Sequence, residues 1–178
     1  MAEAHTLSCT CGQVQLTARQ SPIIVTECHC NSCRSAGAVL QTLPGATSVL
    51  DANGGTPFVL YRKDRIGFPK GSDLLAEYRL SPDAPTRRVV ASCCNTALFL
   101  EFEHGHWLSI YGHLWPQGTM PGIEVRTMTG DRAGGPALGS EIPSGKLATA
   151  GFYARLLGAW IAMGFKQPKI RVGGTVTP

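Results

Sequence analysis

All seven cysteines of this chain lie in three short clusters, and thiols grouped in this way predict a metal site. The clusters are Cys9-Thr10-Cys11, Cys28-His29-Cys30-Asn31-Ser32-Cys33 and Cys93-Cys94. A thiolate is a soft, anionic ligand, and two or three of them within a few residues can close on one soft cation. Zinc is the metal that best matches a sulfur-rich site in a reducing compartment. We therefore predict that all seven cysteines are zinc ligands.

Other uses of the cysteines fit the sequence less well. Seven is an odd number of thiols, and residues 1–8 contain no apolar stretch typical of a signal peptide, so disulfide bonds are disfavoured. A bridge between Cys9 and Cys11 would also be strained in an extended strand. A redox Cys-x-x-Cys motif is present in Cys30 to Cys33, but it leaves Cys28 unexplained. An iron–sulfur cluster also uses thiolates and stays open as the alternative metal group.

Length and composition limit the classes of function. The 178 residues predict one domain, or one domain with an appendage, and a hydrophobic content of 43% is enough for a core. No apolar run approaches the length of a membrane span. The net charge of +4 comes from dispersed arginines and lysines, whereas nucleic-acid binding usually needs a denser basic stripe. We expect a cytoplasmic protein without membrane contact, and nucleic acid is a disfavoured partner. A homo-oligomer stays open.

Short strands are predicted through the first 115 residues, because β-branched and apolar runs recur between Gly, Pro, Asn and Asp. The run at residues 22–28 would deliver the second cysteine cluster at its end, and one helical turn is expected at residues 31–36. The other expected strands are residues 12–18, 37–43, 57–61, 74–80, 87–92, 96–102 and 107–111. This pattern is typical of a mainly β fold of antiparallel strands.

The last third of the chain has a different composition. Residues 116–145 are rich in Gly and Pro and are expected to form a long surface excursion. Ser144 would then cap a helix over residues 146–163, and we expect the wide apolar face of this helix to pack on the β domain. The predicted organisation is a β domain at residues 7–115, the excursion at 116–145, and a packed C-terminal helix and tail at 146–178.

The order of these motifs resembles the glutathione-dependent formaldehyde-activating enzyme family, a group that includes the centromere protein V domain. The resemblance rests on Ser8-Cys9-Thr10-Cys11-Gly12, on Cys28 to Arg34, and on a late cysteine followed by a turn and a strand, and it runs from Leu7 to Tyr111. It implies a β-tent fold with two zinc ions per chain. In the family, Cys-x-Cys and a later Cys-x-x-Cys make a closed structural site. The Cys-x-Cys-x-x-Cys motif makes a second site that accepts a substrate thiol.

The late motif departs from the family pattern. The family has Cys-x-x-Cys-Gly-Thr, whereas this chain has Ala91-Ser92-Cys93-Cys94-Asn95-Thr96. Cys94 matches the second family ligand, Ala91 replaces the first, and Cys93 is a new thiol, as in a divergent branch. Cys93 can join the first site only if the chain turns there, and Asn95 favours such a turn. If Cys93 instead joins Cys28, Cys30 and Cys33, that site closes and becomes a poor catalyst.

Two functions follow from the resemblance. The first is a carbon–sulfur lyase that acts on adducts of glutathione or another small thiol with an aldehyde. Cys28, Cys30 and Cys33 would form its catalytic site, and Arg34 would bind the anionic substrate, with Arg62, Arg65, Arg87 and Arg88 behind it. The second is a non-catalytic, zinc-stabilised domain that binds a protein partner. His29 is expected to point away from the metal, and His104, His106 and His113 are candidates to approach a pocket.

Overall fold

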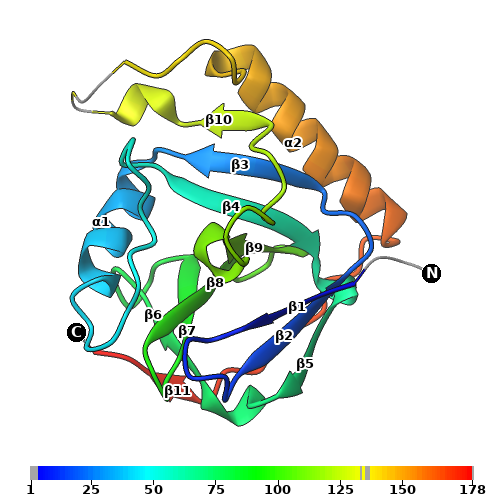
Figure 1. Ribbon diagram of the computed structural model, residues 1–178. Helices are drawn as coiled ribbons and strands as arrows, with labels where there is room; N and C mark the ends of the chain where they lie inside the picture. Colours follow the sequence, from blue (N-terminus) through cyan, green and yellow to red (C-terminus); the bar gives the residue numbers. More distant parts are fainter. Residues whose placement is uncertain (1–3, 133, 135–136, 178) are drawn as a thin grey trace.

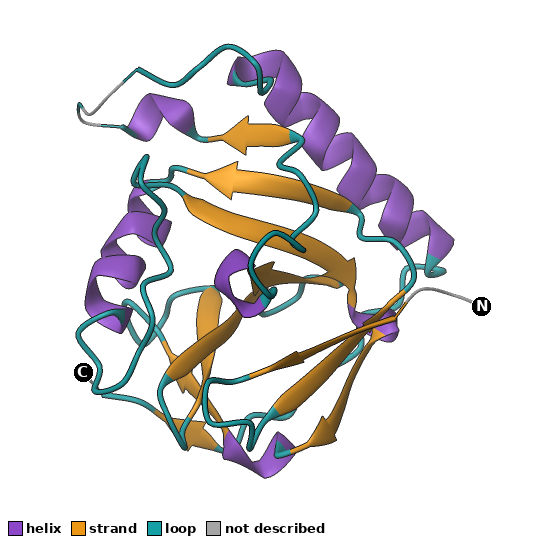
Figure 2. Ribbon diagram, in the orientation of Figure 1, coloured by secondary structure: helices purple, strands orange, loops and turns teal. Residues whose placement is uncertain are grey.

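Within residues 4–132, 134 and 137–177, which the computed structural model describes, the chain forms two β-sheets and two α-helices (Figures 1 and 2). The smaller sheet has the order β1-β2-β5, and the larger has the order β10-β3-β4-β9-β8-β7-β6-β11. The small sheet contains β1 (Ala4–Ser8), β2 (Gln15–Arg19) and β5 (Ile66–Lys70). The large sheet contains β3 (Ile24–Cys28), β4 (Thr56–Arg62), β6 (Leu75–Tyr78), β7 (Thr86–Ala91), β8 (Thr96–Phe102), β9 (Trp107–Tyr111), β10 (Val125–Thr127) and β11 (Gly174–Thr175).

The helices are α1 (Asn31–Leu40) and α2 (Gly145–Ala162), and short 3-10 turns occupy Lys63–Arg65, Ser72–Leu74, Gly112–Leu114 and Thr129–Asp131. Neighbouring strands of both sheets are antiparallel, except that β10 pairs in parallel with β3 and β11 with β6. The predicted mainly β fold of short antiparallel strands with a C-terminal helix is confirmed.

The large sheet carries a hydrophobic core on each of its faces. Val59 and Tyr61 of β4 face the small sheet, whereas Phe58 and Leu60 face the side on which α1 and α2 pack. All four side chains are buried. Because side chains alternate along a strand, a strand covered on both faces reads as a continuous apolar run. This arrangement explains why the central strands were recognisable from the sequence although few of them alternate between apolar and polar residues.

Residues 37–43, predicted as a strand, are helical as far as Leu40, so that prediction is wrong. α1 begins after Cys30, whose Sγ atom accepts a hydrogen bond from the backbone N–H of Cys33 at 3.3 Å. A Cβ atom at Gly37 would lie only 2.7 Å from the Leu50 side chain. The glycine therefore allows the loop after α1 to pack against the helix. Glycine weakens a helix by about 1 kcal/mol, which made this segment read as extended.

The C-terminal third of the chain is built into the fold by strand pairing and by one side of α2. β10 lies inside residues 116–145, expected as a surface excursion, and its three residues are buried beside β3. After α2 the tail returns and adds β11 to the far edge of the large sheet. Leu156 of α2 is buried, whereas Leu147, Leu157 and Ile161 are exposed, so much of the predicted apolar face does not pack. Neither α-helix in the described ranges could cross a lipid bilayer.

Candidate metal centres

The first cysteine group joins the turn after β1 to the turn between β7 and β8. Cys9 and Cys11 lie in a turn where the Gly12 N–H donates to the Cys9 carbonyl at 2.9 Å. Cys93 and Cys94 come from the β-hairpin turn, 82 or more residues later in the chain. The Sγ atoms are 3.6 Å apart for Cys9 and Cys11, 3.3 Å for Cys11 and Cys93, and 3.8 Å for Cys93 and Cys94. All four sulfur atoms lie within 4.8 Å of one another.

This spacing suits a tetrahedral zinc ion. A zinc–sulfur bond of about 2.3 Å makes the edge of a four-sulfur tetrahedron about 3.8 Å long. The distance of 3.8 Å between the Sγ atoms of Cys9 and Cys93 also agrees with that edge. The N–H of Val14 donates to the Cys9 sulfur at 3.2 Å and helps to hold it in place. The group therefore has the number, type and spacing of donors that a closed zinc site requires.

A left-handed residue lets adjacent cysteines reach the same point. Asn95 has a φ of 55°, as its amide side chain led us to expect, and its N–H donates to the Ala91 carbonyl at 2.8 Å. The Cys94 N–H donates to the same carbonyl at 3.2 Å, so the chain reverses directly after β7. Ala91 itself is buried in the strand and paired with Thr96. Cys93 thus supplies the thiol that is missing at Ala91, the position of the first cysteine in the late motif of the family.

The hydroxyls of two threonines lie close together beside the Cys94 sulfur of the same group. Thr96 Oγ1 lies 2.9 Å from Thr10 Oγ1 and 3.1 Å from the Cys94 sulfur. Partial burial raises the pKa of the Cys94 thiol, but hydrogen bonds from Thr10 and Thr96 outweigh that effect and lower it to about 5. Burial and the neighbouring thiols raise the pKa of Cys93. The surroundings of Cys94 therefore favour its thiolate form, the form in which a cysteine binds a metal.

The second cysteine group lies on the opposite face of the large sheet. Cys28 ends β3, Cys30 precedes α1, and Cys33 occupies the first turn of that helix. Their Sγ atoms lie within 4.8 Å of one another, and no other His, Cys, Asp or Glu of the described ranges completes the group. The donors again suit zinc, but only three are present. Cys93 packs with the core on the other face, so this group stays at three thiols.

The strand end that carries Cys28 is held by a buried polar network. Glu27 accepts a hydrogen bond from Arg126 Nε of β10 at 2.9 Å, and its other carboxylate oxygen lies 2.8 Å from His29 Nε2. His29 is fully buried. It joins neither cysteine group. Its alternation with Cys28 and Cys30 directs it towards Glu27, and the network fixes the direction in which the cysteines emerge.

Arg88 is the cation that faces the second group. It lies on β7, is 1% exposed, and its Nη2 atom donates to the Ser32 hydroxyl at 2.6 Å and to the Ser32 carbonyl at 3.2 Å. Hydrogen bonds from Cys28 and Cys33, and then the charge of Arg88, lower the pKa of the Cys30 thiol to about 2. No carboxylate of the described residues lies within 4.0 Å of the Arg88 guanidinium. The buried charge is therefore available to an anion at the three thiols.

A cavity of about 600 Å³ opens onto the three thiols. Cys28, Cys30 and Cys33 line it together with Ser32 and Arg88. The strands of the large sheet and the residues before β7 supply most of the remaining wall, and α2 closes it with Thr149, Phe152 and Tyr153. A thiol that entered this cavity would have both the cysteines and a buried cation within its walls.

Arg34, the cation expected from the sequence to bind the substrate, lies away from the cavity. Arg34 donates to Asn31 on the outer side of α1 and does not line the cavity, whereas Arg88, placed behind it, does. The other arginines are held by nearby groups: Arg62 by Asp64, Arg65 by the Ser21 carbonyl, and Arg87 by Glu77 and Glu101. In the strand register, Arg88 pairs with Leu100, whose side chain lies on the face that the helices cover, whereas Arg87 pairs with Glu101. Only this register distinguishes the two arginines, and the sequence alone does not give it.

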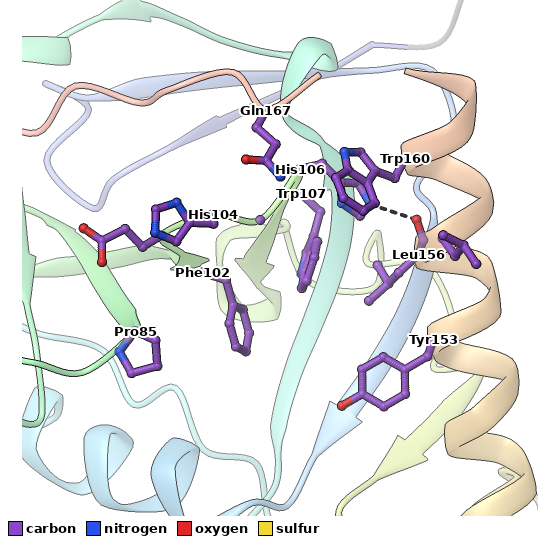
Figure 3. A pocket seen from close by; sticks show the side chains of 12 residues that line it. Pro85, Phe102, His104, His106, Trp107, Tyr153, Leu156, Trp160 and Gln167 are labelled. Atoms are coloured by element: carbon purple, nitrogen blue, oxygen red, sulfur yellow. Dashed lines mark hydrogen bonds between the residues drawn. The ribbon is translucent and has the colours of Figure 1, made fainter. Parts of the chain in front are cut away.

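The three late histidines do not join a cysteine group. His113 is largely buried, and burial lowers its pKa to about 4. His104 and His106 line a second cavity of about 400 Å³, shown in Figure 3. His106 Nε2 lies 2.8 Å from the Leu156 carbonyl and must donate to it, and its ring stacks on Trp160 at 5.6 Å between centroids. This contact fastens α2 to the start of β9.

Comparison with known proteins places these features in one family. The sequence model described as "Glutathione-dependent formaldehyde-activating enzyme" matches residues 4–113. A search among curated proteins gives no match. Among solved structures, a crystal structure of a Rhodobacter sphaeroides protein is 13% identical in sequence. The alignment covers 66% of this chain and 92% of that chain, with a TM-score of 0.44.

Proposed function

Because the chain belongs to the glutathione-dependent formaldehyde-activating enzyme family, we propose that it is a zinc-binding carbon–sulfur lyase for adducts of a small thiol and an aldehyde. Cys9, Cys11, Cys93 and Cys94 would hold a structural zinc ion, and Cys28, Cys30 and Cys33 would hold a second. Bound at three thiolates, zinc supplies a free coordination position that lowers the pKa of an incoming thiol. This proposal gives the two cysteine groups different tasks.

The reaction is a reversible addition. A thiol R–SH adds to an aldehyde R′–CHO to give the hemithioacetal R–S–CH(OH)–R′: the carbon–sulfur bond forms, and the carbonyl oxygen gains the thiol proton. Cleavage reverses each change, so no redox partner is needed. The chain's own residues would bind and orient the adduct inside the cavity. Arg88 would balance the negative charge of the thiolates and the substrate, and the apolar walls would exclude water.

One observation carries this proposal: Cys93 lies with Cys9, Cys11 and Cys94, so the group that faces the 600 Å³ cavity has three thiols and not four. A zinc ion held by four thiolates has no free position, whereas three leave one for a substrate. The three thiols and the buried charge of Arg88 line the same cavity, so a thiol bound there would be near both. These features favour a thiol-binding site over a purely structural zinc site.

A non-catalytic domain that binds a protein partner is the second candidate. It is favoured by exposed apolar side chains along α2 and just beyond it: Leu157 and Ile161 are 52% and 55% exposed, and Phe165 after the helix is 59% exposed. Exposed apolar side chains spaced by four residues form one stripe on a helix, a feature of helices that pack against another protein. In this case both zinc ions would be inert towards small thiols.

A titration with thiols separates the two candidates. The zinc-loaded protein is titrated with glutathione and with small apolar thiols, and the Cys33→Ser variant serves as the matched control because Cys33 belongs only to the second group. The lyase proposal predicts saturable binding of one thiol per chain, lost in C33S. It also predicts acceleration of exchange between formaldehyde and its adduct with the thiol that binds, measured by NMR exchange spectroscopy. Thiol-inert zinc and an unchanged exchange rate would support the partner-binding domain instead.

A further inference from the structure

The walls of the cavity at Cys28, Cys30 and Cys33 are mainly aromatic and aliphatic. Five aromatic side chains line it, namely Phe58, Phe102, Trp107, Phe152 and Tyr153. Asp83 and Arg88 are the charged side chains in the described part of its lining. A wall of this kind gains free energy when it covers apolar surface and loses it when it covers unpaired charge. The lining therefore indicates whether the body of a bound thiol is apolar or charged.

α2 supplies the aromatic side chains of the wall that lie outside the family match, where Thr127 and Met128 also contribute. Thr149, Phe152 and Tyr153 come from this helix, whereas the family model ends at residue 113. The helix is fixed in place by the hydrogen bond between His106 and the Leu156 carbonyl, visible in Figure 3. Arg155 also pairs with Glu124, the residue before β10. Phe152 and Tyr153 thus extend, from a helix held in place, the aromatic wall that Phe58, Phe102 and Trp107 begin.

The apolar space continues beyond this cavity. The second cavity, of about 400 Å³, shares Pro85, Phe102, Trp107 and Tyr153 with the first, so the two lie side by side between α2 and the β8–β9 hairpin. Figure 3 shows Phe102, Trp107 and Tyr153 lying around one space between the sheet and the helix. A group bound at the three cysteines can therefore extend along aromatic side chains towards the surface.

Glutathione matches this lining poorly. The tripeptide carries two carboxylates and one ammonium group, but the cavity offers one guanidinium, Arg88. Two terminal nitrogens of that guanidinium already donate to Thr86 and Ser32. The second carboxylate of glutathione would then have no cationic partner in the described lining, only neutral serine and threonine hydroxyls, which offset less of the cost of its burial. A thiol with an apolar body and at most one carboxylate avoids this cost.

We infer that the thiol partner of the Cys28, Cys30 and Cys33 site has a predominantly apolar body, and that α2 selects it. This inference rests on the proposed function, since it assumes that a thiol binds at the three cysteines. Phe152 and Tyr153 act as specificity residues, because they contact the body of the thiol and not its sulfur. The reacting sulfur is left to the cysteines and Arg88.

Calorimetric titration of the zinc-loaded, full-length protein with three thiols tests the inference. The probes are phenylmethanethiol, ethanethiol and glutathione, under oxygen-free conditions. Burial of one phenyl group predicts that phenylmethanethiol binds about tenfold to a hundredfold more tightly than ethanethiol, and also more tightly than glutathione. Quenching of tryptophan fluorescence gives a second readout that does not depend on activity, because Trp107 lines the cavity.

Variants on α2 locate the selectivity. Phe152→Ala and Tyr153→Ala should each reduce the preference for phenylmethanethiol about threefold to tenfold while ethanethiol binding stays the same. Leu147→Ala is the matched control, because Leu147 lies on the same helix, is 87% exposed and lines neither cavity. If F152A does not fold, the half-exposed Tyr153 carries the test, since its truncation removes little packing.

The outcomes distinguish failure of the inference from failure of the proposed function. Equal or tighter binding of glutathione, or an unchanged preference in Y153A, overturns the inference and leaves the proposed thiol-binding function in place. Failure of all three thiols to bind overturns the proposed function and the inference together. A tighter fit of phenylmethanethiol that is lost in Y153A and kept in L147A supports both.

Discussion

The Sγ atom of Cys93 lies 3.3 Å from that of Cys11, although 82 residues separate the two cysteines. This proximity decides how the seven thiols are shared, because Cys93 was equally able, by sequence, to close either group. With Cys93 beside Cys11, the group at Cys28, Cys30 and Cys33 remains incomplete and faces a cavity. The division into a closed and an open site follows from this one contact.

Removal of the Cys93 thiol tests that division. Cys93→Ser should reduce the zinc content from two ions per chain to one, and the free energy of unfolding should fall by about 3 kcal/mol or more, because zinc binding at such a site is coupled to folding. Metal analysis after dialysis and a denaturant titration measure these changes. The C33S variant is the control: it should lose the other zinc ion and thiol binding with a smaller loss of stability. A C93S protein that keeps two zinc ions but no longer binds thiols would contradict the assignment.

Arg88 should matter for thiol binding where Arg34 does not. Arg88→Gln removes the buried charge that faces Cys30, and thiol affinity should fall about tenfold to a hundredfold, the usual effect of losing a charge-assisted hydrogen bond. Arg34→Gln, on the outer side of α1, should change it less than twofold. Arg88→Lys keeps the charge and should recover part of the loss. Equal effects of R34Q and R88Q in calorimetric titrations would show that general surface charge, and not Arg88, attracts the thiol.

The turn that unites Cys93 and Cys94 depends on a left-handed residue. Asn95→Ala should destabilise the protein by about 1–2 kcal/mol, because alanine is strained at a φ of 55°. It also removes the hydrogen bond from the Asn95 side chain to the Pro44 carbonyl. Asn95→Gly removes the same hydrogen bond without the strain, so it should be less harmful. Chemical denaturation compares the two variants, and a glycine variant as unstable as N95A would show that the backbone conformation is not the cause.

His113 makes stability sensitive to acid. Burial lowers its pKa to about 4, below the value of about 6.5 expected in the unfolded chain, so folding favours the neutral ring. This contribution is fully present above pH 6.5 and is lost as the pH falls towards 4. The change is about 3 kcal/mol, since one unit of pKa corresponds to about 1.4 kcal/mol.

The comparison with His113→Gln isolates this effect from acid loss of zinc, which both proteins share. The difference in unfolding free energy between wild type and H113Q, followed by denaturant titration between pH 7 and 4, should shift by that amount in favour of the variant. A constant difference would show that His113 is protonated equally in the folded and unfolded states.

Several features of the site were predictable because they depend on local chemistry. The clustering of thiols predicted groups of sulfur atoms that could hold a metal ion, and the amide of Asn95 indicated the turn that brings Cys93 and Cys94 together. The central strands were recognisable because apolar side chains on both faces of a covered sheet give continuous apolar runs. In each case the determining interaction lies within a few residues of the motif.

The features that were missed depend on distant contacts. The segment at residues 37–43 was read as a strand because Gly37 serves a packing contact with Leu50, not an extended backbone. Arg88 was ranked below Arg34 because sequence proximity to Cys33 suggested spatial proximity, whereas strand register places Arg88 at the cavity. The short strands β1, β10 and β11 form only when partners elsewhere in the chain are present.

X-ray absorption at the zinc edge tests the central claim most directly, because it counts the sulfur atoms around each metal. With four thiols in one group and three in the other, the free protein should show an average of 3.5 sulfur ligands per zinc ion. Addition of phenylmethanethiol should raise this average to about 4, as the open position takes a thiol. An average of 4 in the free protein, or one of 3.5 that saturating thiol leaves unchanged, would contradict the account.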